Sequence, residues 1–182
     1  PAIKHIHDVK WVISYSDSSY KRIIEQKMKE KNFETLFVAN RGRDVMPFLQ
    51  VVQKYKNDNY SHIFKLHTKL SSHRKDGEQW GKSTINCITR FADLENIANK
   101  MIAQNIGMLG PESELMELNY YLEKNKNYIS LFSGFLGIDL DDFNPKVIFG
   151  NMFLADFRIF KVPVFSYDFA SLAPEELGQV DG

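Results

Sequence analysis

The chain has 182 residues, 43% of them hydrophobic, which is enough to bury the core of one domain. Its 23 basic residues balance its 23 acidic residues, which excludes a chain-wide attraction to nucleic acid or to an anionic membrane. The one cysteine, Cys87, excludes an internal disulfide, and we interpret it as a buried core residue. Neither end looks native, so we interpret residues 1–182 as one domain and as a fragment of a longer protein.

The first half of the chain alternates between strand and helix patterns. Residues 9–15 are rich in β-forming side chains, and residues 20–28 carry an apolar stripe at helical spacing that we expect to be buried. A second strand is predicted from Glu34 to Ala39, a helix begins at Val45, and a third strand is predicted from Tyr60 to Leu66. This βαβαβ order has connections short enough for a parallel sheet, which predicts an α/β fold.

The second half is less regular. Leu94 to Ile102 has the spacing of a helix, and Ile106 to Leu109 predicts a short strand stopped by Gly110 and Pro111. A further helix is predicted through Leu115, Leu118 and Leu122. Residues 147–155 predict one strand, in which Gly150 marks a bulge or a close backbone approach.

Two polar clusters follow the second and third predicted strands. The first contains Asn40, Arg41, Gly42, Arg43 and Asp44, and the second contains Lys65, His67, Lys69 and Arg74. Because the carboxyl ends of parallel strands meet at one edge of a sheet, we expect a single shared site. Five cations at a helix N-terminus would suit a diphosphate. An equally good interpretation pairs Arg43 with Asp44, leaves the lysines solvated and makes Gly42 a simple turn residue.

Other polar residues have two interpretations each. Ser16 and Asp17 can contact a base or ribose, although helix capping also explains them. Asp44 can cap the helix that begins at Val45. Glu175 and Glu176 are candidate general bases, or acids of a first helical turn. The histidines match no metal-binding spacing, so no metal site is predicted.

Five separated blocks of the chain resemble the rhamnan synthesis protein F family. They are Asn40 to Leu49, Lys65 to Arg74 with Gly77 and Trp80, Ile106 to Pro111, Phe149 to Phe153, and Glu175 to Gly182. The resemblance implies a glycosyltransferase that moves a sugar from a nucleotide-sugar to a glycan or lipid-linked glycan of the bacterial surface. It implies a cytoplasmic location, peripheral to the inner face of the cell membrane. The balanced charge predicts no nucleic-acid partner, and the lack of a long apolar run predicts no membrane span in this segment.

The predicted start resembles the nucleotide-binding half of GT-A-type glycosyltransferases, which implies a GT-A-like (Rossmann-like), mostly parallel sheet flanked by helices. Such enzymes carry an acidic metal-binding motif where this chain has Lys65 to Lys69. We therefore expect no covalently bound cofactor and transfer without a divalent metal, with Glu175, Glu176 or Asp181 as the base. The alternative is a non-catalytic glycan- or nucleotide-binding module, in which aromatic residues such as Trp80 pack against sugar rings.

Overall fold

The computed structural model describes residues 9–67, 77–89, 94–118, 126–139 and 145–162. None of the helices in these ranges has the length and apolar character that crossing a bilayer requires. The elements, in chain order, are β1 (Trp11–Tyr15), α1 (Tyr20–Met28), β2 (Phe33–Phe37), α2 (Val45–Tyr55), β3 (His62–Lys65), α3 (Gly77–Thr89), α4 (Leu94–Ala103), β4 (Met108–Leu109), η2 (Glu112–Glu114), β5 (Leu115–Glu117), α5 (Lys126–Leu136), β6 (Lys146–Ile148), β7 (Phe153–Asp156) and η5 (Phe157–Phe160).

The first three elements form a parallel strand–helix–strand unit, as the sequence predicts. β1 and β2 pair in parallel from Trp11 beside Phe33 to Tyr15 beside Phe37. Asp17 lies in the connection between them, where its Oδ1 accepts a hydrogen bond of 2.8 Å from the backbone amide of Ser19. Ser19 is the N-cap residue of α1 and makes no side-chain capping hydrogen bond, so Asp17 orders the turn before the helix and does not cap it.

The second sheet has the order β3–β7–β4, and both of its strand pairs are antiparallel. All four residues of β7 are buried, as its near-continuous apolar run and its central position require. The expectation that β3 extends a parallel sheet with the first two strands is therefore wrong. β3 pairs with a strand that lies far along the chain, and local patterning cannot reveal such a partner. A GT-A-like fold for the whole domain stays a prediction.

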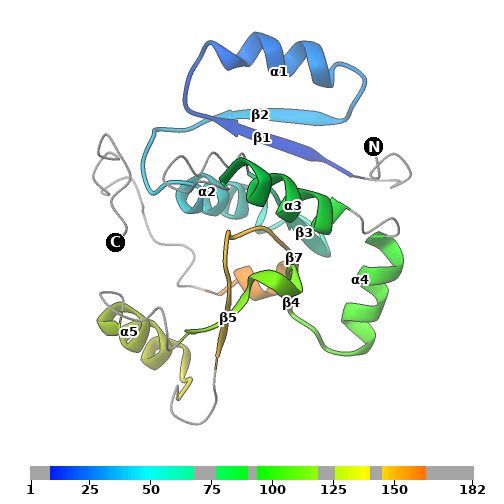
Figure 1. The fold of residues 1–182 in the computed structure, drawn as a ribbon. Helices are drawn as coiled ribbons and strands as arrows, with labels where there is room; N and C mark the ends of the chain where they lie inside the picture. The colour runs from blue at the N-terminus through cyan, green and yellow to red at the C-terminus, as the bar shows by residue number, and fades with distance from the viewer. Residues whose placement is uncertain (1–8, 68–76, 90–93, 119–125, 140–144, 163–182) are drawn as a thin grey trace.

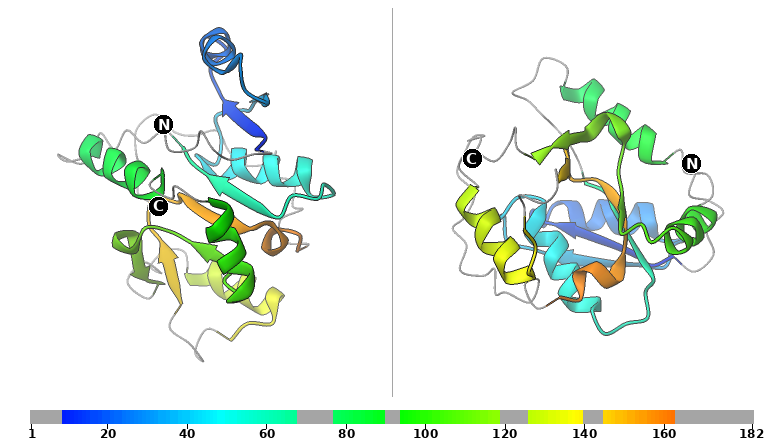
Figure 2. Two further views of the ribbon diagram at one scale, coloured as in Figure 1. Left: turned by 90° about the vertical axis from the view of Figure 1, so that its right-hand side faces the viewer. Right: turned by 90° about the horizontal axis from the view of Figure 1, so that it is seen from below.

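Helix α2 lies between the two sheets and supplies much of the core. Its Val52 and Tyr55 belong to one buried cluster with Phe153 and Phe157, and Val12 of β1 packs against that cluster. On its β2 side, the Tyr55 hydroxyl donates a hydrogen bond of 2.6 Å to Glu34. Figure 1 shows α1 and α2 on opposite sides of the β1–β2 pair, and the left view of Figure 2 keeps this order of layers.

Two elements of the second half differ from the sequence-based expectation. Leu115–Glu117 form strand β5, which pairs antiparallel with β6, and the predicted helix there is wrong. Residues 147–155 are not one strand, because Gly150 and Asn151 take φ values of 81° and 51° and turn the chain between β6 and β7. The Gly-Asn pair therefore ends one strand and redirects the chain to a different sheet.

Side-chain burial also differs at two helices. The apolar stripe of α1 was expected to be buried, yet no residue of α1 is buried, and Tyr20 and Ile23 are 56% and 49% exposed. Cys87 lies exposed on α3, so its interpretation as a core residue is wrong. Neither helix α3 nor helix α5 was predicted from the sequence.

Two glycines predict opposite effects on stability. A Cβ at Gly110 would lie 2.7 Å from Cγ2 of Ile148, whereas a Cβ at Gly134 in α5 would meet no atom within 4 Å. Gly110→Ala should lower the free energy of unfolding by about 1–3 kcal/mol, because a branched side chain must move. Gly134→Ala should raise it by roughly 0.5–1 kcal/mol, because alanine favours a helix. Urea unfolding measures both, and equal effects would contradict this packing of β6.

Candidate functional site

A turn between β2 and α2 presents Asp44. Gly42 and Arg43 both have left-handed backbone conformations, with φ values of 60° and 50°. The carbonyl of Gly42 accepts hydrogen bonds from the amides of Val45 and Met46, each 3.1 Å long, which joins the turn to the first turn of α2. A non-glycine residue in this region costs roughly 1–2 kcal/mol, so the surrounding contacts must hold Arg43 there.

The carboxylate of Asp44 is the centre of a polar cluster. Its Oδ2 accepts hydrogen bonds from Lys65 Nζ at 2.5 Å and from Asn151 Nδ2 at 2.7 Å. His67 Nε2 lies 3.7 Å from the same oxygen and 2.7 Å from the carbonyl oxygen of Gly150. Because a carbonyl oxygen can only accept, His67 Nε2 must carry the proton. We call these five residues, Asp44, Lys65, His67, Gly150 and Asn151, the Asp44 cluster.

Three separate segments meet in the Asp44 cluster. Asp44 follows β2, Lys65 and His67 lie at the end of β3, and Asn151 precedes β7. The antiparallel register places Lys65 opposite Phe153, so the end of β3 lies beside the start of β7. The Asp44 carboxylate thus joins the end of the β1–β2 pair, the β3–β7–β4 sheet and the N-terminus of α2.

Burial sets the electrostatics of the cluster. Lys65 is only 5% exposed, and its Nζ lies 5.2 Å from the ring centre of Phe48 and 5.6 Å from that of Phe153. Burial lowers the pKa of Lys65, and the hydrogen bond and charge of Asp44 offset this only in part. Burial also opposes ionisation of Asp44, but Lys65, His67 and Asn151 together hold the pKa of that carboxyl below its usual value.

The structure brings together some of the predicted site residues. Asp44, Lys65 and His67 converge, as expected for the ends of neighbouring segments. Asp44 occupies the N-cap position of α2, but its side chain makes no capping hydrogen bond because it binds Lys65. The interpretation of Lys65 as a solvated lysine is also wrong, since it is buried and ion-paired.

The remaining predicted residues lie around the cluster or outside the described residues. Asn40 and Arg43 are exposed on the turn after β2, where Arg41 and Gly42 are half-buried. Ser16 and Asp17 are exposed just after β1. Five predicted residues fall outside the described ranges: Lys69, Arg74, Glu175, Glu176 and Asp181.

Sequence reasoning missed Gly150 and Asn151. They were read as a bulge in one strand, although Gly-Asn between two apolar runs is a strong turn signal. Recognising that turn would have placed a polar side chain at the start of a new strand. Its contact with Asp44, 107 residues away, could not be inferred without the tertiary fold.

The described residues contain no group of three His, Cys, Asp or Glu side chains placed to hold a metal ion. The central feature of the site is instead a carboxylate with cationic and amide donors. Such an arrangement can hold a loop rigid, exchange a proton near His67, or orient a ligand that reaches the strand ends.

Comparison with known proteins defines the family of this α/β chain. The profile of the family described as rhamnan synthesis protein F matches residues 2–158. The chain belongs to the rhamnan synthesis protein F family, as the resemblance of its sequence blocks indicated. The match includes the whole Asp44 cluster.

Two curated relatives come from Xanthomonas campestris pv. campestris, strains B100 and ATCC 33913, and both are named uncharacterized protein WxcX. Each is 30% identical over 144 residues, which is 79% of this chain. The chain spans only 21% of the length of these relatives. No solved structure matches the chain significantly.

The pairing of Asp44 with Lys65 can be tested by a double-mutant cycle. Asp44→Asn should lower the free energy of unfolding by about 3 kcal/mol, because it leaves a buried ammonium without its counter-charge. Lys65→Met should cost less, since Asn151 still donates to the partly exposed carboxylate. The double variant should be more stable than the sum of the single losses by at least about 1 kcal/mol.

The matched control for this cycle is the exposed pair of Lys82 and Glu78 on α3, whose charged atoms lie 2.6 Å apart. Solvent screens that pair, so its coupling in the same urea experiment should be clearly smaller. Equal coupling in the two cycles would contradict a buried Asp44–Lys65 interaction.

The lowered pKa of Asp44 predicts the pH dependence of stability. The unfolded chain binds a proton at this position more tightly than the folded chain, because the folded pKa is lower. The stabilisation from Asp44 should be complete above the unfolded pKa of about 3.9 and should disappear as the pH falls through the folded pKa. The measurement is the difference in unfolding free energy between wild type and Asp44→Asn from about pH 7 to about pH 3. If the difference in unfolding free energy grows as the pH falls, the pKa of Asp44 is raised by folding, which would contradict this prediction.

Proposed function

We propose that this chain takes part in moving a sugar, rhamnose by its family name, from a nucleotide-sugar donor to a growing bacterial surface polysaccharide. Membership of the rhamnan synthesis protein F family supports polysaccharide synthesis as the setting. The observation that carries the proposed site is the Asp44 cluster, which fixes the ends of two strands and the start of α2 in one place. A binding site at such strand ends is common in α/β proteins.

The proposed donor site uses the turn after β2. Arg41 and Arg43 lie on this turn beside the N-terminus of α2, where guanidinium groups and the positive end of the helix dipole favour a diphosphate. Asn40 and the Ser16–Asp17 segment would contact the rest of the nucleotide. Lys65 has a different role from the one expected, because its charge is already balanced by Asp44. It acts as a positioning residue that holds the turn.

The proposed reaction needs one base. An acceptor hydroxyl oxygen attacks the anomeric carbon, the bond from that carbon to the diphosphate oxygen breaks, and the hydroxyl proton moves to a carboxylate. Glu175, Glu176 or Asp181 supplies that carboxylate in this proposal. Fixed cations stabilise the leaving diphosphate, so the proposed reaction needs no divalent metal. We place this reaction at the cytoplasmic side of the membrane.

A binding module without catalysis is the second candidate. It is favoured by the internal pairing of Lys65, which removes one of the five cations from the expected diphosphate contacts. Under this alternative, the same turn would hold a nucleotide or glycan for a catalytic site elsewhere in a longer protein. The two candidates differ in whether nucleoside diphosphate is released.

Release of nucleoside diphosphate from a panel of nucleotide-sugars tests the proposal, with this chain and with any longer native protein that contains it. Loss of the true base among Glu175→Gln, Glu176→Gln and Asp181→Asn should slow release by about 10²–10⁴-fold. Arg43→Ala and Lys69→Ala should each weaken donor binding by roughly tenfold to a hundredfold. Lys82→Glu at an exposed position of α3 is the control and should change neither quantity.

Binding of a donor without release from any nucleotide-sugar would favour the binding module. Activity that EDTA abolishes and manganese restores would refute transfer by fixed cations alone. Unchanged donor affinity in both Arg43→Ala and Lys69→Ala would leave the turn with a structural role only.

A further inference from the structure

A second polar site lies at the other end of β7 from the Asp44 cluster. β7 begins just after Asn151 and ends at Asp156, so the two ends lie roughly 10 Å apart at about 3.3 Å per residue. A hollow of about 350 Å³ opens there between the end of α4 and the start of η5. Its lining consists of Met101, Asn105, Ile106, Gly107, Asp156, Arg158 and Ile159. This volume is in the range of small-ligand sites.

The charges in this hollow compensate one another. Asp156 is only 6% exposed, and its Oδ2 accepts hydrogen bonds from Arg158 Nε at 2.9 Å and from the terminal nitrogen Nη2 at 2.5 Å. The backbone amide of Arg158 donates to Asp156 Oδ1 at 2.8 Å. The hollow therefore offers a buried carboxylate paired with a largely exposed guanidinium, without a net charge, which does not favour a diphosphate.

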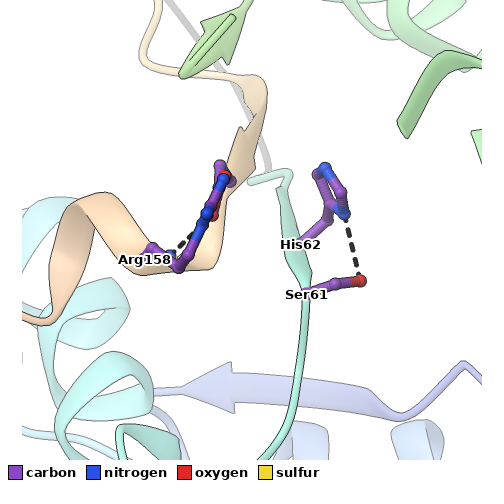
Figure 3. A network of polar contacts seen from close by, with 4 residues as sticks. Ser61, His62 and Arg158 are labelled. Carbon is purple, nitrogen blue, oxygen red and sulfur yellow. Dashed lines mark hydrogen bonds and ion pairs between the residues drawn. The ribbon is translucent and has the colours of Figure 1, made fainter. Parts of the chain in front are cut away.

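His62 adds an unused hydrogen-bonding atom next to this pair. It lies opposite Asp156 in the β3–β7 register, and Figure 3 shows it on β3 with Ser61, beside the strand that leads to Arg158. Its Nδ1 is 3.1 Å from the Ser61 hydroxyl, while its Nε2 is buried and has no hydrogen-bond partner within the described part of the chain. This nitrogen is buried and His62 is not among the residues that line the hollow, so it marks a polar environment beside Asp156 and does not itself contact a ligand there.

Asn105 supplies an amide that the fold itself does not require. The residue has a φ of 54° and follows α4, where the amide of Ile106 donates to the carbonyl of Met101 and the amide of Asn105 donates to that of Ile102. These two bonds are a Schellman cap, which uses only the backbone and which glycine also satisfies. The side chain of Asn105 is therefore not needed to end the helix, although it lines the hollow.

We infer that this hollow binds a neutral carbohydrate, the acceptor glycan of the transfer proposed above. Amide, carboxylate and guanidinium groups bind sugar hydroxyls in pairs, while the half-buried Ile106 and Ile159 pack against the C–H faces of the ring. The lack of a net charge favours a neutral sugar over an anionic one. The identity of the ligand as an acceptor rests on the proposed function, whereas its binding to the hollow does not.

Binding is measured by NMR titration of the chain with a rhamnose trisaccharide and no nucleotide. Asn105→Gly should keep the helix cap and weaken binding by about fivefold or more. Gln104→Ala is the matched control, because it removes an exposed amide at the same helix end that does not line the hollow, and it should change the affinity less than about twofold.

A second pair of variants tests the hollow by filling it. A Cβ at Gly107 would only touch Ile159, at 3.5 Å, so Gly107→Val should fold and reduce trisaccharide binding. Gly134→Val on α5 is its control. Binding that survives both Asn105→Gly and Gly107→Val, or no binding by the folded wild-type chain, would overturn the inference. Trisaccharide binding without nucleoside diphosphate release would leave it standing while refuting the transferase.

Discussion

The buried ion pair between Asp44 and Lys65 is the interaction on which the rest of the site depends. An ammonium group that is 5% exposed is costly to bury unless a counter-charge and hydrogen bonds accompany it. Asp44 supplies both, and Asn151 shares the same carboxylate oxygen at 2.7 Å. The interaction therefore fixes three chain segments that share no local sequence contact.

The packing of helix α2 explains why the Asp44–Lys65 ion pair lies at the end of β3. The helix packs between the β1–β2 pair and the β3–β7–β4 sheet, with Val52 and Tyr55 in the main core. Its N-terminus then has to meet the end of β3, where Phe48 and Phe153 make an edge-to-face contact with ring centres 5.5 Å apart. These rings form the apolar side of the Lys65 environment, and the turn with Gly42 and Arg43 forms the polar side. The proposed donor and acceptor sites then lie at opposite ends of β7.

The sequence predicts the parts of this arrangement that depend on neighbouring residues. Strong patterns placed β1, α1, β2, α2 and β3 in the right order, and the strand-end clusters that contain Asp44 and Lys65 do meet. Pairings between distant segments were not predictable, because nothing near β3 specifies β7 as its partner. The same reason hid β5, whose short apolar run matches either a strand or a helix until Lys146–Ile148 is brought beside it. Asn151 was missed because its partner is distant and its turn was read as a bulge.

Titration of Asp44 by carbon-detected NMR of its Cγ tests the central claim most directly. The account predicts an apparent pKa below the usual aspartate value, with chemical shifts of Lys65 Nζ and the Asn151 side-chain amide changing over the same pH range. An ordinary pKa, or a titration that Lys65 and Asn151 do not sense, would contradict it. Either result would mean that the strand ends are not held together by this carboxylate.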